Sequence, residues 1–218
     1  MKIIKSLLLC IIYSTISFAQ KAECFCDKDT LMNNSTVGCD TTYFSNGSKI
    51  YWQYNCDRIW LTLENSRNNK VVIDEVPSEY YQYTYRLGFS LVKEYKNCLL
   101  FRGGCPANGP CIYTLVDKDN GKKIKSFSQL ICMDTKDDKG APQKYNYDFV
   151  VDLSENLDNI FVYFIDDKRI KKSPFKDRLT SVIPQSQFEK MTLTNDILTI
   201  YYEIDNCNDT KSITINLK

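Results

Sequence analysis

Ten cysteines and no histidine stand among the 218 residues, and these two counts constrain the fold and the chemistry of the chain most strongly. Cysteine-rich chains of modest length use disulfides to support a core, provided that they reach an oxidising compartment. Without histidine the chain forms neither a Ser-His-Asp or Cys-His catalytic set nor a zinc site with imidazole ligands. The balance of 28 Lys+Arg against 27 Asp+Glu also argues against nucleic acid, which requires a basic face.

The N-terminal residues predict export. A short basic start precedes the mostly apolar run Ser6–Phe18, and the small residue Ala19 follows it, as in a secretory signal peptide. An apolar run of about 13 residues is shorter than the ~20 that a membrane-spanning helix needs. We therefore expect residues 1–19 to be a cleaved signal peptide. Residues 20–218 are then expected in the periplasm, at the cell surface or in the extracellular space, without an integral membrane segment.

Nine cysteines follow residue 19, and in an oxidising compartment they predict a disulfide framework with at least one thiol left over. The candidates are Cys24, Cys26, Cys39, Cys56, Cys98, Cys105, Cys111, Cys132 and Cys207. The turn-rich stretch between Cys105 and Cys111 favours a bond between these two. In an extended segment Cys24 and Cys26 point the same way, so each is expected to reach a different partner. Cys39 and Cys56 are the nearest cysteines downstream.

Neither a metal nor a cofactor is expected. A metal site at Cys24, Cys26 and Cys39 would need four thiolates in the absence of histidine, and no Cys-x2-Cys pair is present. The same absence argues against a disulfide oxidoreductase. Asp117-Lys118-Asp119-Asn120-Gly121 is typical of a hairpin turn, because its glycine stands fifth, where a calcium loop has its glycine sixth.

Short apolar segments rich in β-branched and aromatic residues predict strands in preference to helices. The expected strands are Lys49–Asn55, Arg58–Glu64, Lys70–Asp74, Leu87–Tyr95, Asn97–Arg102, Cys111–Asp117, Lys122–Phe127, Tyr147–Leu153, Ile160–Asp166, Leu179–Ile183, Ile197–Asp205 and Ser212–Leu217. A helix is expected over Gln185–Met191. The predicted class is all-β: a disulfide-stapled β-sandwich or barrel of roughly ten to twelve strands, with at most one short helix.

We expect residues 20–218 to form a single β-rich domain. The polar stretch Asp134–Lys144 is the alternative domain boundary, because only Cys207 of the nine cysteines follows it. A β-propeller is disfavoured, since at ~40–45 residues per blade the chain allows four blades at most, and no motif recurs at a fixed period.

Glu79–Arg86 is the most distinctive stretch, with four tyrosines in six residues. As a strand it would place Tyr81, Tyr83 and Tyr85 on one face. Tyrosine and arginine are favoured at contacts with partners, so these three tyrosines and Arg86 are the candidate binding residues for a protein or a glycan. The alternative is an ordinary strand whose three tyrosines pack on the core.

Three function classes stay open. The first is an exported β-rich binding protein of the cell envelope or extracellular space. The second is an inhibitor or immunity protein against a toxin or hydrolase, which would present the loop Cys98–Cys111. The third is a secreted hydrolase using two carboxylates from a set of candidates: Asp148, Asp152, Asp166 and Glu203. The sequence brings no two of these acids together, so no catalytic residue is assigned and a non-enzymatic role is favoured.

A short stretch bears on the second class. Tyr54-Asn55-Cys56-Asp57, followed by an alternating strand, is similar to the Tyr-x-Cys opening of small periplasmic lysozyme inhibitors. The similarity spans these four residues, and no functional residue is carried over from it.

Overall fold

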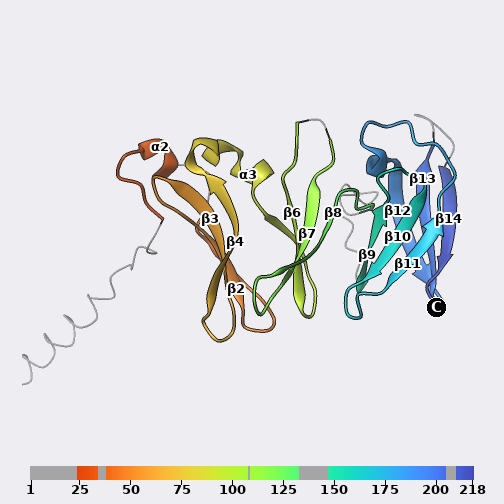
Figure 1. Cartoon of the computed structure of the whole chain (residues 1–218), viewed down its shortest axis with the longest axis horizontal. Coiled ribbons are helices and arrows are strands. Elements are labelled where there is room, and N and C mark those ends of the chain that lie inside the picture. Colours follow the sequence, from red (N-terminus) through yellow and green to blue (C-terminus); the bar gives the residue numbers. More distant parts are fainter. Residues whose placement is uncertain (1–23, 34–37, 108, 133–146, 205–209) are drawn as a thin grey trace, which may run out of the picture.

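The computed structural model of the chain describes residues 24–33, 38–107, 109–132, 147–204 and 210–218 (Figure 1). The predicted signal peptide, the alternative domain boundary at 134–144 and Cys207 lie outside the described residues. Within them, no helix combines the length and the apolar composition that a membrane crossing requires.

Fourteen strands of the described part form four antiparallel sheets, each a meander of consecutive strands. The first sheet contains β1 (Thr41–Tyr43), β2 (Lys49–Tyr54), β3 (Arg58–Glu64) and β4 (Lys70–Pro77). The second contains β5 (Ser90–Glu94), β6 (Cys98–Gly103), β7 (Ile112–Asp117) and β8 (Lys123–Phe127). The third contains β9 (Phe149–Leu153), β10 (Asn159–Phe164) and β11 (Ile170–Pro174). The fourth contains β12 (Phe188–Thr194), β13 (Ile197–Glu203) and β14 (Thr210–Asn216).

The predicted all-β class with disulfides is confirmed, in the form of a layered sandwich that does not close into a barrel. The helices are short: α2 (Thr30–Asn33), α3 (Thr84–Leu87), and the 3-10 helices η1 (Ser78–Tyr83) and η2 (Pro184–Gln187). The Asn120-Gly121 hairpin between β7 and β8 is present, with Gly121 at φ +69°. Strands β1, β11 and β12 were not expected from the sequence.

Two local predictions on the approach to the fourth sheet are wrong. Leu179–Ile183 is not a strand, because the N–H groups of Thr180 and Ser181 donate to the side chain of Gln187 and pair with no strand. Gln185–Met191 is not a helix beyond one 3-10 turn. Phe188 and Met191 lie three apart yet both face the core, because a bulge between Phe188 and Lys190 shifts the register of β12.

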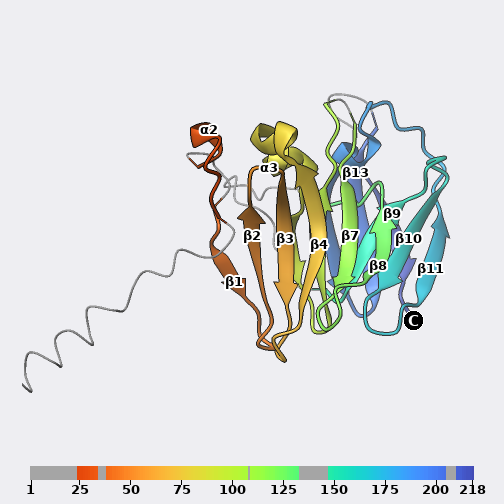
Figure 2. The same cartoon turned by 60° about the vertical axis from the view of Figure 1, so that its left-hand side comes forward.

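The four sheets pack face to face in a row (Figures 1 and 2). Alternation within β6 shows how: Leu99 and Phe101 face the first sheet, whereas Cys98 and Leu100 face the third. The largest core lies between the third and fourth sheets and includes Phe149, Val151, Leu153, Ile160, Val162, Phe188, Met191, Leu198 and Ile200. The second and third sheets are therefore buried on both faces.

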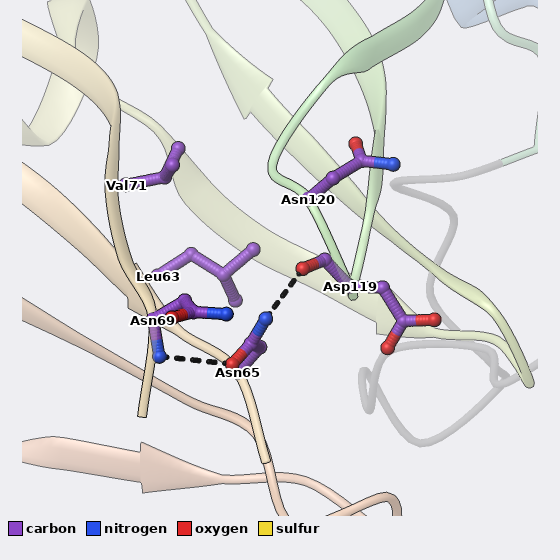
Figure 3. Close-up of a pocket in the computed structure, with 6 residues that line it drawn as sticks. All are labelled: Leu63, Asn65, Asn69, Val71, Asp119 and Asn120. Carbon is purple, nitrogen blue, oxygen red and sulfur yellow. Dashed lines mark hydrogen bonds between the residues drawn. The ribbon is translucent and has the colours of Figure 1, made fainter. Parts of the chain in front are cut away.

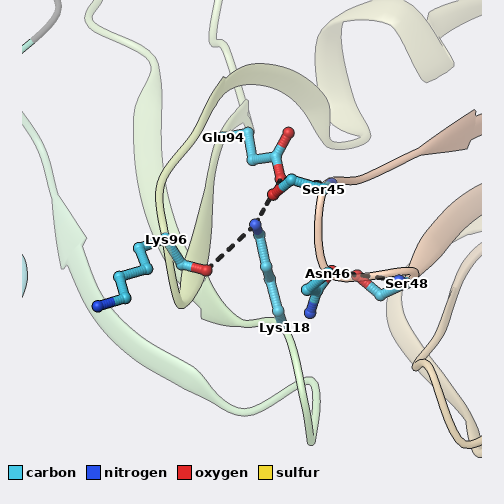
Figure 4. Close-up of polar contacts among 6 residues, drawn as sticks. All are labelled: Ser45, Asn46, Ser48, Glu94, Lys96 and Lys118. Carbon is cyan, nitrogen blue, oxygen red and sulfur yellow. Dashed lines mark hydrogen bonds and ion pairs between the residues drawn. The ribbon is translucent and has the colours of Figure 1, made fainter.

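An ion pair between a buried lysine and a half-buried glutamate lies where the turn between β1 and β2 meets the second sheet (Figure 4). The side chain of Lys118 is 1% exposed, and its Nζ lies 2.5 Å from Oε1 of Glu94. The same carboxylate accepts hydrogen bonds from the hydroxyl and the backbone N–H of Ser45, at 2.6 and 3.0 Å. Desolvation raises the pKa of Glu94, but the hydrogen bonds from Lys118 and Ser45 outweigh it, and the pKa lies below its ordinary value.

Three disulfides are present among the described residues: Cys24–Cys39, Cys26–Cys56 and Cys105–Cys111. Cys24 and Cys26 reach different partners, as expected for neighbouring cysteines that point the same way. Cys98 was a disulfide candidate, and this is corrected: its thiol is free and faces the core between the second and third sheets. Burial raises the pKa of Cys98 to about 11, which makes the thiol unreactive at neutral pH. Cys132 is buried between the third and fourth sheets.

Candidate binding surface

The tyrosine-rich segment forms the connection from the first sheet to the second, and its predicted strand geometry is wrong. Residues 78–83 form η1 and residues 84–87 form α3. The segment begins after Pro77, which lacks a backbone N–H and ends β4. It has to turn the chain from one layer to the next, and two consecutive helical turns do so within ten residues.

The helical turns distribute the tyrosines over different surroundings. Tyr81 is half-buried and packs against the core beside the N-terminal disulfides. Tyr80, Tyr83 and Tyr85 are 47%, 49% and 65% exposed, and Leu87 is 41% exposed. The candidate residues Tyr81, Tyr83 and Tyr85 therefore do not share one face. Tyr81 anchors the segment, and the other large side chains meet solvent.

Two contacts fix the position of this segment. The hydroxyl of Thr84, which is buried, donates to the carbonyl oxygen of Tyr81 at 2.8 Å. Gly88 ends α3 directly against Trp52 of the first sheet: a Cβ at this position would lie 2.8 Å from Cη2 of Trp52. Only glycine allows so close an approach, and the exposed side chains of α3 are therefore held in a defined place.

The N-terminal segment lies beside η1 and is cross-linked twice. Cys26 and Cys24 form disulfides to Cys56 and Cys39, and these sulfurs pack in the same cluster as Tyr81. Asn33 of α2 adds a bidentate link: its Oδ1 accepts the N–H of Cys26 at 2.8 Å, and its Nδ2 donates to the carbonyl of Cys26 at 2.6 Å. On this segment Phe25 is 57% exposed and Leu31 is 65% exposed.

The Cys105–Cys111 loop lies on the other side of α3. The N–H groups of Gly104 and Cys105 donate to the carbonyl oxygens of Leu87 and Arg86, at 3.0 and 2.9 Å. The guanidinium of Arg86 returns a bond to the carbonyl oxygen of Cys105 at 3.4 Å. Arg86, a candidate binding residue, thus positions the loop. Ile112, directly after the disulfide, is 48% exposed.

These three segments lie in a row along one end of the molecule (Figures 1 and 2). We call their exposed apolar and aromatic side chains the aromatic surface: Phe25, Leu31, Tyr80, Tyr83, Tyr85, Leu87 and Ile112. Two of these seven residues, Tyr83 and Tyr85, are among the binding residues predicted from the sequence. The exposure of Phe25 could also have been predicted from the sequence. Phe25 stands between Cys24 and Cys26, and in an extended segment a residue between two inward-pointing cysteines points outward.

The loop that an inhibitor was expected to present, Cys98–Cys111, is closed by a disulfide over a shorter range than predicted. Cys98 lies within β6, so the cross-link encloses only residues 105–111. The three donor atoms of Cys26, Asp27 and Cys56 lie within 4.8 Å of one another, in an arrangement that would suit a metal. Two of these atoms are the sulfurs of one disulfide, however, and a disulfide sulfur is not a thiolate ligand.

The four carboxylates considered for hydrolysis lie in different surroundings. Burial raises the pKa of Asp152 to about 6, and this side chain accepts the N–H of Gln129 at 3.3 Å. Glu203 pairs with Glu189, a residue that sequence reasoning did not select. Partial desolvation and the hydrogen bond between the two side chains raise the pKa of Glu189. Glu189 is exposed, so this pair lacks the dry surroundings in which acid–base catalysis is efficient. Two candidates are also exposed: Asp148 and Asp166.

No protein-family model matches the chain, and no curated protein matches it either.

Proposed function

We propose that this chain is an exported binding protein that holds a protein partner through the aromatic surface, in the cell envelope or outside the cell. One observation carries the proposal: Tyr80, Tyr83, Tyr85 and Leu87 follow one another on a single short connection, and each is more than 40% exposed. Large exposed apolar groups in one place are typical of interaction sites. Tyrosine supplies contact area together with a hydroxyl for hydrogen bonding, and it is enriched where binding energy concentrates.

The cross-linked segments on both sides of the tyrosine-rich connection support the same proposal. The connection lies between the double cross-link of the N-terminal segment and the Cys105–Cys111 loop, and hydrogen bonds or packing tie it to both. A pre-organised surface loses little conformational entropy when a partner binds. An inhibitor that blocks a hydrolase or toxin is the special case in which the partner is an enzyme, and the small cross-linked loop beside α3 favours that form.

Export rests on two independent features. Residues 1–19 have the layout of a secretory signal peptide, and the chain forms disulfides, which persist in oxidising compartments. Expression of the whole chain in an exporting bacterium checks this part. Intact mass is expected to show a mature chain that begins at Gln20, whereas an uncleaved chain retained in the cytoplasm contradicts it.

Affinity capture tests the binding role. The whole chain carries a C-terminal affinity handle, because the C-terminus lies at the other end of the molecule from the aromatic surface (Figure 1). The bait is exposed to extract of the cell envelope and to culture medium, and bound proteins and glycans are both analysed. We expect one protein at near-equal stoichiometry, whose dissociation constant is then measured with the purified pair.

The double variant Tyr83→Ala/Tyr85→Ala separates this surface from non-specific capture. Two central tyrosines are expected to contribute enough that their removal weakens binding at least tenfold. The matched control is Tyr43→Ala, because Tyr43 is 73% exposed and pairs with Lys49, at the far end of β2 from the disulfide cluster. Equal binding by both variants, or capture of glycan alone, contradicts the proposal.

A further inference from the structure

The strand β14 forms an open edge of the fourth sheet, at the outer side of the molecule (Figure 1). It pairs with β13 in an unbroken register from Thr210 to Asn216. On its other side, the backbone groups of Ser212, Thr214 and Asn216 form no hydrogen bond with any described residue. A row of unpaired N–H and C=O groups on an edge strand is a template for a further strand.

The other sheet edges of the described part are protected against such pairing. In β4, β5, β8 and β12 a bulge places an extra residue on the edge strand. β11 contains Lys171, Lys172 and Pro174, and β1 is only three residues long. The free side of β9 is covered, because residues 129–131 form hydrogen bonds with its backbone. Bulges, lysine, proline, short strands and coverage all prevent contact between edges, and β14 has none of them over residues 212–216.

The hydrogen-bond pattern shows which groups of β14 face the open edge. The N–H of Leu217 donates to the carbonyl oxygen of Asp196, on the β13 side, at 2.7 Å. In an antiparallel pair the N–H and C=O groups of alternate residues point to the same neighbour, so the even-numbered residues of β14 direct theirs outward. Ser212 and Thr214 lie at the centre of this outward set.

The side chains of β14 also suit a further strand. Ile213 and Ile215 contact the core between the third and fourth sheets, while Ser212 and Thr214 are exposed on the opposite face. Residues 212–216 carry no charge. A strand that extends both faces of this sheet needs the same alternation of apolar and polar side chains, and β14 of a second copy meets this requirement.

The lysines at the two ends of this stretch are paired within the chain. Nζ of Lys211 lies 3.3 Å from Oδ1 of Asp177, and Nζ of Lys218 lies 3.1 Å from Oδ2 of Asp196. A lysine on an edge strand opposes pairing with another edge through its charge. Here each of the two charges has an acidic partner, which weakens that effect.

We propose that two copies of this chain form a dimer by antiparallel pairing of their β14 strands. A two-fold axis at Ile213 aligns the strands over their whole length, with Ser212 of one copy opposite Thr214 of the other. The outward groups from Thr210 to Asn216 then form about eight hydrogen bonds between the copies. The two half-buried Ile213 side chains meet, and the two fourth sheets continue as one.

Sedimentation of the whole purified chain at rising concentration tests the dimer. We expect a monomer–dimer equilibrium with a dissociation constant on the order of 10–100 μM, because a single strand pair is a small contact. Hydrogen exchange adds a measurement that needs no variant. The N–H groups of Ser212 and Thr214 should exchange about tenfold more slowly when 90% of the chain is expected to be dimeric, by roughly the fraction left open. A chain that stays monomeric up to about 1 mM, or assemblies that grow beyond a dimer, would overturn the proposal.

Two variants at one position separate backbone pairing from other contacts. Thr214→Pro removes an N–H that has no partner in the monomer, and proline is tolerated on an edge strand whose N–H faces solvent. Because the two-fold repeats each substitution, two hydrogen bonds between the copies are lost, and the dissociation constant is expected to rise at least about tenfold. Thr214→Ala keeps the N–H and is expected to change the constant by about twofold at most. Urea unfolding checks that both variants fold.

The double variant Tyr83→Ala/Tyr85→Ala is the control for the aromatic surface, and it is expected to dimerise like the wild type. Equal dimerisation by Thr214→Pro and Thr214→Ala would place the contact elsewhere and overturn the proposal, as would loss of the dimer in the tyrosine variant. If Thr214→Pro does not fold, the exchange rates of Ser212 and Thr214 in the wild type decide. A negative result leaves partner binding through the aromatic surface untouched, because the two contacts are formed by different sheets.

Discussion

The first two sheets and the last two achieve a stable layer contact in different ways. Between the first and second sheets the buried core has eight members, and all three disulfides of the described residues lie within residues 24–111. Between the third and fourth sheets the core has sixteen members, with the rings of Phe175, Phe188 and Tyr202 in mutual contact. Cross-links constrain the unfolded chain, whereas apolar burial stabilises the folded one. The aromatic surface lies in the cross-linked half.

The largest effect on the free energy of unfolding is expected in the third and fourth sheets, which are stabilised mainly by their apolar core. Phe188 is 1% exposed, and its ring centroid lies 5.7 and 5.5 Å from those of Phe175 and Tyr202. Phe188→Ala is expected to lower the free energy of unfolding by about 3–5 kcal/mol, because it leaves a cavity among rigid rings. Urea unfolding measures this. Thr192→Ala, exposed on the same strand, is the control and should stay within about 0.5 kcal/mol of the wild type.

In the cross-linked half, the bond between Cys26 and Cys56 is expected to matter next. The double variant Cys26→Ser/Cys56→Ser opens a 30-residue loop and should lower the free energy of unfolding by about 2–4 kcal/mol. Tyr81 loses part of its packing surface in this variant. Hydrogen exchange is expected to accelerate in α2 and η1 and to stay unchanged in β13. Equal acceleration in β13 would show that the two halves do not differ in this way.

A smaller loss of stability is expected at the Cys105–Cys111 loop, since the two cysteines are only six positions apart in the sequence. Cys105→Ser/Cys111→Ser should lower the free energy of unfolding by about 2 kcal/mol. The N–H groups of Gly104 and Cys105, which bond to α3, are expected to exchange faster. A loss as large as that of the Cys26–Cys56 variant would contradict the dependence on loop length.

The smallest change in the free energy of unfolding is expected at the junction of the two halves. There Asp152 of β9 contacts Gln129 and Leu130, which follow β8. Burial raises the pKa of Asp152 to about 6, from an ordinary value of 3.8. Between these values the folded chain binds a proton that the unfolded chain has lost, so this group's contribution to stability declines as pH rises from 4 to 6.

Replacement of this carboxyl by an amide removes the charge and keeps an acceptor for Gln129. With allowance for partial solvent screening, Asp152→Asn should be about 1–2 kcal/mol more stable than the wild type at pH 7.5. The difference should nearly vanish at pH 4, where the native carboxyl is largely protonated. Urea unfolding at both pH values checks the sign. A variant less stable than the wild type at pH 7.5 would mean that the ionised carboxylate supports the junction.

The sequence predicted the elements whose signal is local. The hairpin at Asn120-Gly121, the alternation of Arg58–Glu64 and the bond between Cys105 and Cys111 each depend on a few neighbouring residues, and all are present. The errors arose where distant groups decide. The N–H groups of Thr180 and Ser181 are satisfied by Gln187, so no strand forms there.

The same distinction applies to the candidate sites. The alternation of tyrosines over Glu79–Arg86 predicts a strand, but these residues connect two sheets and form helical turns. The sequence does not show where one sheet ends and the next begins, so it could not predict this connection. Cys98 gave no signal that it faces the third sheet and not a second cysteine. The hydrogen bond from Asn65 to the carbonyl oxygen of Asp119 (Figure 3) joins two turns that are 54 residues apart in the chain, and no local pattern predicts that these turns meet.

The order of the strands has a consequence for how the chain is made. Each sheet consists of consecutive strands, and the three cores that lie between sheets join sheets that are neighbours along the chain. A ribosome or a translocation channel delivers the N-terminal half first, so the residues of the first two sheets and their cross-links are all available before Phe149 of β9 emerges. During that interval Leu100, Tyr113 and Leu115 face water and await the third sheet, which makes this face the point at which a nascent chain is most prone to aggregate.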